Sequence, residues 1–328
     1  MSLPDLIIRP RRLRSSAAIR RMVSETSLSA ADFIYPLFVD EGIDEPIAVN
    51  SMPGVSRIPV SKVAETVREV EALGIPGIIF FGIPAQKDAI GSGGWDDHGV
   101  VQQAIREAKA ACPDMCVIAD TCFCEYTDHG HCGVLDGEDV DNDATLANLQ
   151  QEALSYARAG IDVIAPSGMM DGMIAAIRSA LDDEGFTNVL IMSYAVKYAS
   201  AYFGPFREAA DCAPSFGNRA TYQMDPGNRR EAIREATLDS DEGADFLIIK
   251  PALAYMDIIR EVKEATLLPI AVYNVSGEYA MVKAASEKGW IDEKRVVLET
   301  MLSFKRAGAD LILSYHALDV ARWLNEDK

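Results

Sequence analysis

The segment DTCFCEYTDHGHC, residues 120–132, contains three of the six cysteines of the chain. Cys122, Cys124 and Cys132 follow the pattern C-x-C-x7-C, and three thiolates at this spacing suit tetrahedral coordination of Zn²⁺. No fourth cysteine lies nearby in the sequence, and three protein ligands with one open position are typical of a catalytic zinc rather than a closed structural site. The spacing therefore predicts a zinc ion that takes part in chemistry.

Two other interpretations of this segment stay open. His129 or His131 could supply a fourth ligand, which would close the site, or the thiols could be redox or structural groups without a metal. The remaining cysteines, Cys112, Cys116 and Cys212, have no partner at a metal-binding spacing. We interpret these three as core or incidental residues.

Two lysines stand at the ends of apolar runs that are predicted to form neighbouring strands. Lys250 ends the run FLIIK, and Lys197 follows the run VLIMSY. Burial at such a position disfavours the ammonium form, lowers the pKa and frees an amine to attack a carbonyl. Two adjacent lysines would lower each other's pKa further by like-charge repulsion. We expect Schiff-base chemistry with one or two ketone substrates; the alternative is a solvated lysine at a strand end.

Residues 195–228 form a long predicted loop that contains Arg207 and Arg219 among aromatic residues, glycines and prolines. A guanidinium group matches a carboxylate through two parallel hydrogen bonds. The length of the loop favours a mobile lid that closes over a substrate acid. Solvated surface arginines are the alternative.

Four further polar residues follow or end predicted strands. Ser276 and Tyr315 are placed as hydroxyl donors, although Ser276 could instead cap the helix that begins at GEYAMVKAA. Asp120 stands two residues before Cys122 and is a candidate proton acceptor near the metal. Ser167, in APSGMMDG, is either a polar contact or a turn residue.

Eight short apolar runs are predicted to be the strands that position these residues: 33–39, 77–82, 115–120, 162–166, 189–194, 245–250, 269–274 and 310–315. Their continuous apolar character is typical of parallel strands buried on both faces, and amphipathic helical patterns separate them. Eight such units predict a TIM (β/α)8 barrel, over residues 31–328, with its active site at the carboxyl ends of the strands. A doubly wound sheet is the second possibility, but no G-x-G-x-x-G follows the first strand.

Composition narrows the class of protein. The net charge of −19 argues against nucleic-acid binding. No apolar run reaches the roughly 20 residues of a membrane span, and the first residues contain no secretory signal, so we expect a cytoplasmic protein without a membrane partner. A reducing compartment favours a metal or redox role for clustered cysteines over disulfides. Residues 1–30 carry six arginines and form either a solvated terminus or an arm that wraps an acidic neighbouring subunit.

Together these segments resemble the porphobilinogen synthase (5-aminolevulinate dehydratase) family, of the zinc-dependent type. The resemblance covers essentially the whole chain. It is carried by RPRRLR, YPLFV, MPGV, DTCFCEYTDHGHCG, APSGMMDG, SYAVKYASAYFGPFR, YQMDPGNRREAIRE, KPALAYMDI, VSGEYAM and RAGADLILSY. The cysteine segment and the lysine–arginine segment are the most specific of these.

The resemblance implies the asymmetric condensation of two 5-aminolevulinate molecules to porphobilinogen with loss of water. It implies that Lys250 holds the first substrate as a Schiff base, and that Lys197 engages the second. Further implied roles are carboxylate binding of the first substrate by Ser276 and Tyr315, carboxylate binding of the second by Arg207 and Arg219, and proton transfer by Asp120. The zinc on the three cysteines would bind or polarise the second molecule.

Two more features are implied by the family alone. The segment NRREAIRE suggests an activating Mg²⁺ near Glu235 at a subunit contact, although a helix-surface glutamate paired with arginine is the alternative. The family also implies a homo-octamer of dimers that embrace through N-terminal arms.

Two rival functions remain at this point. A class I Schiff-base aldolase would share the barrel and one lysine but would not need the cysteines. A non-catalytic zinc or redox-sensing protein would need the thiols but not the lysine pair.

Overall fold

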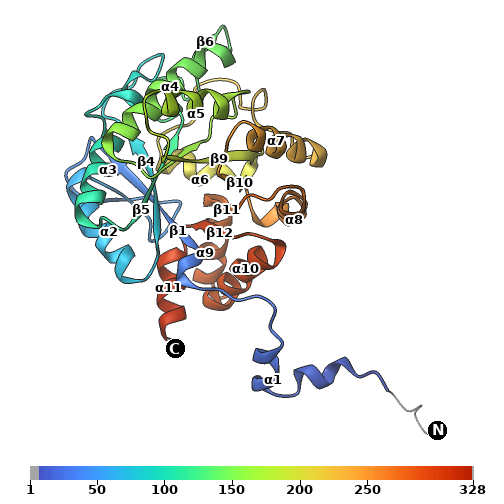
Figure 1. Cartoon of the computed structure of the whole chain (residues 1–328). Coiled ribbons are helices and arrows are strands. Elements are labelled where there is room, and N and C mark those ends of the chain that lie inside the picture. Colours follow the sequence, from blue (N-terminus) through green and yellow to red (C-terminus); the bar gives the residue numbers. More distant parts are fainter. Residues whose placement is uncertain (1–6, 327–328) are drawn as a thin grey trace.

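Eight parallel strands close into a barrel in the computed structural model, which describes residues 7–326 (Figure 1). The strands are β1 (Phe33–Asp40), β4 (Gly77–Ile83), β5 (Cys116–Thr121), β8 (Val163–Pro166), β9 (Leu190–Lys197), β10 (Phe246–Lys250), β11 (Ile270–Asn274) and β12 (Leu311–Ser314). Pairing of Phe33 with Ile312 joins β1 to β12 and closes the sheet. The predicted barrel is confirmed, and the doubly wound alternative is wrong because such a sheet would remain open.

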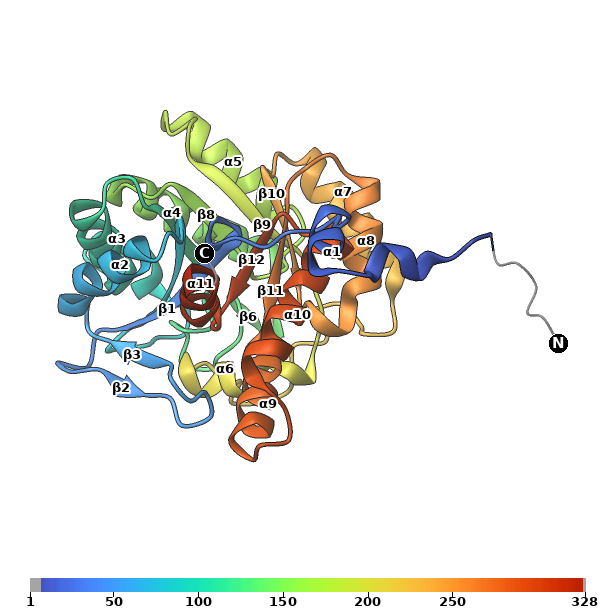
Figure 2. The same cartoon turned by 90° about the horizontal axis from the view of Figure 1, so that it is seen from below.

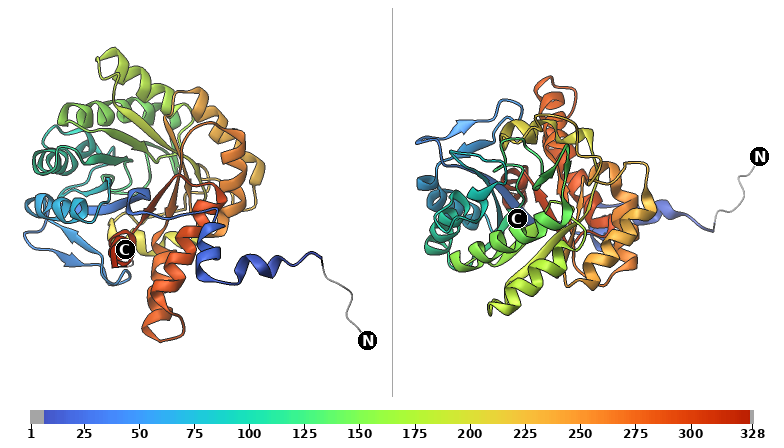
Figure 3. Two further views of the ribbon diagram at one scale, coloured as in Figure 1. Left: turned by 60° about the horizontal axis from the view of Figure 1, so that its bottom comes forward. Right: turned by 90° about the horizontal axis from the view of Figure 1, so that it is seen from above.

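Helices follow every strand of the barrel and surround it (Figures 2 and 3). In chain order they are α2 (Val63–Ala72), α3 (Val100–Ala111), α4 (Asn142–Ala159), α5 (Met173–Asp183), α7 (Arg229–Asp241), α8 (Met256–Ala265), α9 (Ser276–Glu287), α10 (Glu293–Ala307) and α11 (Ala317–Glu326). Both α4 and α10 end at a glycine with positive φ, Gly160 and Gly308, and the next strand begins three residues later. A glycine adopts this backbone conformation without the steric cost of a Cβ atom.

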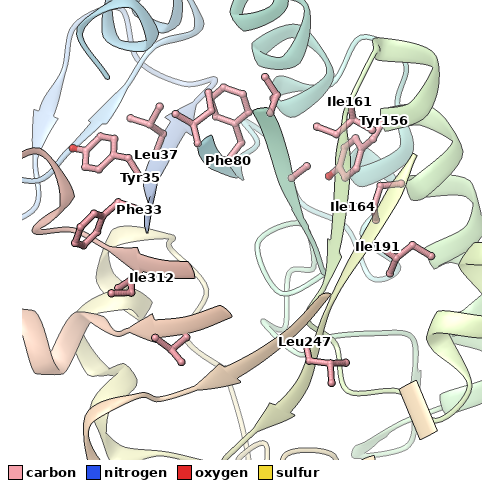
Figure 4. Close-up of a cluster of buried hydrophobic side chains, with 14 of the residues drawn as sticks. Phe33, Tyr35, Leu37, Phe80, Tyr156, Ile161, Ile164, Ile191, Leu247 and Ile312 are labelled. Atoms are coloured by element: carbon pink, nitrogen blue, oxygen red, sulfur yellow. The ribbon is translucent and has the colours of Figure 1, made fainter. Parts of the chain in front are cut away.

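Alternating side chains along each strand divide the apolar core into two layers. Phe33, Tyr35 and Leu37 of β1 point outward and pack under the helices, together with residues such as Phe80 and Ile312 (Figure 4). Ile34 and Phe38, which have the opposite orientation in β1, fill the inside of the barrel. Burial of one such side chain contributes about 1.5–3 kcal/mol, so both layers hold the strands firmly. The inner layer gives way to polar side chains at the carboxyl ends of the strands.

Additional elements lie at the barrel mouth. Strands β2 (Ile47–Ala48) and β3 (Ser56–Ile58) extend the sheet beside β1, and β6 (Leu135–Asp136) pairs with β7 (Asp139–Val140) just after the cysteine segment. The predicted lid contains the 3-10 helix η5 (Ala201–Phe203) and helix α6 (Gly204–Ala209).

Residues 7–22 extend away from the barrel in two views (Figures 1 and 2). They contain the 3-10 helix η1 (Pro10–Arg14) and helix α1 (Ala17–Met22), neither of which has a buried residue. Between residues 7 and 326, none of the helices combines the length and apolar character needed to cross a membrane.

Candidate active site

Lys250 is the last residue of β10 and points into the barrel. Its neighbours two and four positions earlier, Ile248 and Phe246, also lie on the inner side, so the alternation of the strand places its side chain there. Its Nζ lies between 4.6 and 5.3 Å from the centres of four aromatic rings, those of Tyr194, Phe203, Phe206 and Tyr273. Burial, together with the charge of Lys197, lowers the pKa of Lys250 to about 8. The amine is thus available near neutral pH, as predicted.

Lys197 lies beside Lys250 on β9, and it reaches the barrel interior only because of a bulge. The register pairs Leu247 with Ser193 but Ile249 with Val196, so β9 contains one extra residue between these pairs. Simple alternation from Met192 and Tyr194 would have turned Lys197 outward. The bulge restores its inward direction, a common use of bulges near functional sites. The sequence prediction also placed Lys197 after the strand, whereas it is the final residue of β9.

The expected mutual lowering of the two lysine pKa values is wrong for Lys197. Burial disfavours its ammonium form, but the nearby thiol of Cys132, whose own pKa is lowered, outweighs this effect, and the pKa of Lys197 is raised. Its Nζ also donates a hydrogen bond of 2.5 Å to the backbone oxygen of Ser167. The pair therefore consists of one reactive amine and one retained cation.

Asp120 and Ser167 lie together at the ends of β5 and β8. The Ser167 hydroxyl donates a 2.9 Å hydrogen bond to Asp120 Oδ2, so Ser167 is a polar contact rather than only a turn residue. Among the described residues, Asp120 Oδ1 has no hydrogen-bond partner although it is buried. Burial raises the pKa of Asp120. A carboxyl with a raised pKa and one unpaired oxygen beside the lysines is suited to moving protons.

The three predicted cysteines converge in a buried cluster. The Sγ atoms of Cys122, Cys124 and Cys132 all lie within 4.8 Å of one another, and those of Cys122 and Cys124 are 3.4 Å apart. Hydrogen bonds from the other two thiols lower the pKa of Cys132 well below its usual value. Three converging sulfur atoms, of which one is readily deprotonated, are suited to a thiophilic divalent metal.

Two acidic or thiol groups that were not predicted adjoin this cluster. Glu125 and Cys212 lie with Cys124 inside a second group whose ligand atoms are within 4.8 Å. Of the two interpretations of Cys212, it is a buried core residue and not an incidental one. A hydrogen bond from Cys124 and the charge of Arg219 lower the pKa of Cys212 to about 7, while burial opposes them. Cys212 lies eighty residues beyond Cys132 and arrives here only because the lid folds back over the barrel.

The histidines of the segment do not join the thiols. Both His131 ring nitrogens have partners elsewhere, the hydroxyl of Tyr222 at 3.0 Å and the backbone oxygen of Phe216 at 3.1 Å. His129 Nε2 lies 3.2 Å from the backbone oxygen of Ala89. Within residues 7–326, no cluster of metal-binding side chains includes either imidazole. Neither histidine therefore lies where it could be a fourth ligand to the three thiols.

One cavity at the barrel mouth brings most of the predicted residues together. It is lined by the predicted Asp120, Cys124, Ser167, Lys197, Arg207, Arg219 and Lys250, and by Glu125, Phe203 and Phe206. Arg219 is buried and donates hydrogen bonds to the backbone oxygens of Gly130 and Cys212. Arg207 is exposed in the last turn of α6. The two guanidinium groups therefore flank the cavity from the lid.

Ser276 and Tyr315 lie beside this cavity rather than on its lining. Ser276 is the first residue of α9, and its hydroxyl accepts a 2.9 Å hydrogen bond from the Phe206 backbone N–H in the lid, so the helix-cap alternative is wrong. The Tyr315 hydroxyl is 2.8 Å from that of Tyr273. Both hydroxyls are buried, and they adjoin the rings around Lys250.

Glu235 lies on α7, outside the barrel mouth. It lines a separate pocket with Asp139, Asp171, Asp225 and Glu231. Burial, together with the charges of Asp171 and Glu231, raises the pKa of Glu235. Glu235 and the thiol cluster thus line different pockets.

Several residues of the site were not predicted from the sequence. Tyr194 and Tyr273 share the inward alternation of β9 and β11, and this pattern could have identified them. Phe203 and Phe206 belong to the lid, whose path over Lys250 no local pattern reveals. Glu125 lies inside the cysteine segment, between Cys124 and Cys132, and was not predicted either.

The comparisons with known proteins agree with this geometry. Residues 7–323 match the family description "Delta-aminolevulinic acid dehydratase". Proteins of that name from Halalkalibacterium halodurans and Bacillus subtilis are 61% and 58% identical to this chain, with 98% and 97% of the chain and 98% of each relative covered. A crystal structure of the Toxoplasma gondii ME49 enzyme in complex with porphobilinogen superposes with a TM-score of 0.97 at 42% identity, covering 99% of this chain and 93% of that one. The chain belongs to the delta-aminolevulinic acid dehydratase family.

Proposed function

We propose that this enzyme condenses two molecules of 5-aminolevulinate to porphobilinogen with loss of water. The observation that carries the proposal is a single cavity lined by two adjacent lysines, a thiol cluster and two guanidinium groups. A class I aldolase needs one lysine and no thiol cluster, and a zinc or redox sensor needs no buried lysine pair. Neither rival accounts for the whole constellation.

Lys250 is the nucleophile for the first substrate. With a pKa of about 8, part of the amine is neutral at neutral pH and can attack the ketone carbon of 5-aminolevulinate. The resulting carbinolamine loses water to leave an imine on Nζ. Asp120, with its raised pKa and unpaired Oδ1, is positioned to supply and remove the protons that this exchange requires. Ser276 and Tyr315 bind the carboxylate of this substrate from the side of the aromatic rings.

Lys197 and the lid arginines bind the second substrate. Lys197 remains protonated because of the surrounding negative charges, so it serves this molecule first as a cation. The carboxylate of the second substrate pairs with Arg207 and Arg219, because their fork-shaped guanidinium groups match its two oxygens. Ser167 fixes both Asp120 and Lys197 between the two molecules.

Zinc is the metal that the thiol cluster fits. Cys122, Cys124 and Cys132 would hold it, since three buried sulfur atoms within 4.8 Å match the soft ligand preference of zinc and leave a position for substrate. When bound there, zinc would act as a Lewis acid toward the second substrate.

Mg²⁺ is proposed as a separate activating ion near Glu235. The raised pKa of Glu235 reflects repulsion by neighbouring carboxylates as well as burial, and a hard cation would relieve this repulsion. Mg²⁺ retains several waters, so it does not require three protein ligands in close contact.

The assembly and location are also proposals. The exposed N-terminal residues include Ile7, Ile8 and Met22, each more than four-fifths exposed, which suits an arm that packs on another copy. We propose a homo-octamer built through these arms, in the cytoplasm.

The central test is a colorimetric assay. Purified protein with added Zn²⁺ is incubated with 5-aminolevulinate, and porphobilinogen is detected with Ehrlich's reagent. Formation of porphobilinogen supports the proposal. Absence of product from folded, zinc-loaded protein would contradict it and leave the aldolase or sensor interpretation.

A further inference from the structure

The lid of this enzyme is held at three places, and each place supports a different part of the site. Its first part, residues 200–206, rests on α9: the Phe206 N–H donates to Ser276 Oγ, and an added Cβ at Gly277 would lie 2.5 Å from the Tyr202 oxygen. This part supplies Phe203 and Phe206, the rings beside Lys250. The environment of Lys250 is therefore secured by α9.

The last part of the lid, residues 213–219, rests on the cysteine segment. The Ser215 N–H donates a 3.0 Å hydrogen bond to the His129 oxygen, and Arg219 donates to the Gly130 oxygen. Gly130 lies so close to the lid that an added Cβ would be 2.5 Å from the Ala213 oxygen. Arg219 is thus secured independently of α9.

The middle of the lid, residues 207–212, comprises the end of α6 and the turn after it; Arg207, Glu208 and Asp211 are exposed, whereas Ala209, Ala210 and Cys212 are buried. Lys87, from the loop after β4, donates a hydrogen bond to the backbone oxygen of Asp211 and forms a 2.8 Å ion pair with its carboxylate. Asp211 has a φ of +49°, a conformation that non-glycine residues adopt infrequently. Arg57 of β3 donates to the backbone oxygen of Glu208 on the same turn.

Lys87 itself stands on a firmly attached loop. The next residue, Asp88, pairs with Thr127 of the cysteine segment through a parallel bridge, and its carboxylate accepts hydrogen bonds from the Ile90 and Ser92 N–H groups. The side chains of Lys87 and Asp211 are 21% and 64% exposed, so solvent screens part of their attraction, and the hydrogen bond from Lys87 to the Asp211 backbone oxygen adds to it. A cation on a firmly attached loop therefore faces the exposed side of this part of the lid, opposite the side that packs on the barrel.

We propose that Lys87 is a positioning residue that holds the turn at Asp211 and thereby places Arg207 for the carboxylate of the second substrate. The inference rests on the proposed role of Arg207. Because Lys250 and its aromatic neighbours are secured by α9, loss of Lys87 should affect the second substrate and spare the first. Lys87 does not line the active-site cavity, so it would act on the substrate only through the lid.

The test compares Lys87→Met with wild type in the zinc-loaded enzyme. We expect KM for 5-aminolevulinate to rise about threefold to tenfold, the range for loss of a partly screened ion pair with an accompanying hydrogen bond, and kcat to change less than about twofold. Borohydride trapping of 5-aminolevulinate on Lys250 should be unchanged. Lys87→Arg should recover part of the lost affinity, because it restores the charge.

Two further variants sharpen the comparison. Asp211→Asn keeps a residue that tolerates positive φ but removes the charge, so it should raise KM in the same direction, and the double variant should be less than additive. Lys263→Met is the matched control: it removes a 2.6 Å ion pair with Asp310 at the opposite end of the barrel and should leave KM unchanged.

The outcomes separate this inference from the proposed function. If wild type traps substrate on Lys250 but Lys87→Met has a normal KM, or loses trapping in proportion to its loss of turnover, the positioning role is wrong. If wild type neither traps substrate nor forms porphobilinogen, the proposed function itself fails.

Discussion

At Lys250, burial among four aromatic rings and the charge of Lys197 combine to lower the pKa of the amine to about 8. Asp120 opposes this shift, since its negative charge favours the ammonium form. The residue therefore combines two needs of a Schiff-base nucleophile, a neutral fraction at physiological pH and a nearby proton carrier. Lys197, on the neighbouring strand, experiences more negative charge and remains a cation.

Replacement of Lys250 should nearly abolish turnover. Lys250→Met and Lys250→Gln remove the nucleophile, and Lys250→Arg keeps a charge that does not titrate in the useful range. Peptide mapping after borohydride reduction with 5-aminolevulinate should find the adduct on Lys250. An adduct confined to Lys197, or none on either lysine, would overturn the assignment.

The rate of imine formation should depend on pH with the sign set by the lowered pKa. The reactive form is the neutral amine, so the single-turnover rate should fall as pH decreases through about 8 and level off above it. Borohydride trapping at a series of pH values measures this rate. A rate that stays constant between about pH 6 and about pH 9 would show that the Lys250 amine is not the titrating group.

Lys250 should also destabilise the folded protein. Its pKa is lower in the folded state than in the unfolded chain, so the folded state binds fewer protons between about pH 8 and 10.5, and the full penalty is present below pH 8. The shift corresponds to about 3 kcal/mol as an order of magnitude. Lys250→Met should therefore raise the denaturant midpoint at pH 7 and lose this advantage as pH rises toward 10.5. If Lys250→Met and wild type had equal denaturant midpoints at both pH values, Lys250 would not destabilise the folded state.

At the scale of elements, sequence alternation predicts much of the site but not all of it. The inward positions of β5, β10 and β12 could be counted from their apolar neighbours, which correctly turns Asp120, Lys250 and Tyr315 toward the barrel axis. The same count fails for Lys197, because the bulge in β9 depends on pairing with β10. It also fails for Cys212, because only the tertiary path of the lid brings this thiol to Cys124.

The cysteine segment should control activity without controlling the fold. Its thiols lie in the loop after β5, at the edge of the inner layer, whereas most of both apolar layers is formed by the strands and helices. Chelation of zinc, or Cys122→Ser, should therefore abolish porphobilinogen formation while circular dichroism of the barrel stays unchanged. Cys116→Ser is the control. Cys116 is the first residue of β5, whereas the three thiols of the cluster follow the last residue of this strand. Full activity of the chelated, zinc-free enzyme would contradict the assignment of a catalytic zinc to the three cysteines.

Helix α7 should carry the response to Mg²⁺. Glu235→Gln or Glu235→Ala removes the carboxylate and should abolish stimulation by Mg²⁺ while a basal, zinc-dependent rate remains. Glu287→Gln, an exposed glutamate on α9, should keep the stimulation. Survival of the Mg²⁺ response in the Glu235 variants would place the ion elsewhere.

For the whole molecule, charge and exposed apolar surface are distributed unevenly. The chain has a net charge of −19, yet six arginines and three highly exposed apolar side chains occur among residues 7–22. A basic, apolar segment that leaves its own barrel is suited to contact an acidic surface on another copy. The positions of the charges could be predicted from the sequence. Only the structure shows that the segment extends away from the barrel.

Removal of residues 1–24 should reduce the size of the assembly and leave the barrel folded. The deletion ends before Leu28, which packs against the core, and before Asp32, which pairs with Lys305, so the contacts that attach β1 to α10 are retained. Sedimentation velocity should show a species smaller than the proposed octamer, and a salt titration of the full chain should weaken the assembly because screening reduces charge attraction. Combined serine substitutions at Ile7, Ile8 and Met22 should act in the same direction. Leu267→Ser, which removes a fully exposed apolar residue from a barrel loop, is the matched control and should leave the assembly intact. An octamer that persists without residues 1–24 would show that the barrels associate through another surface.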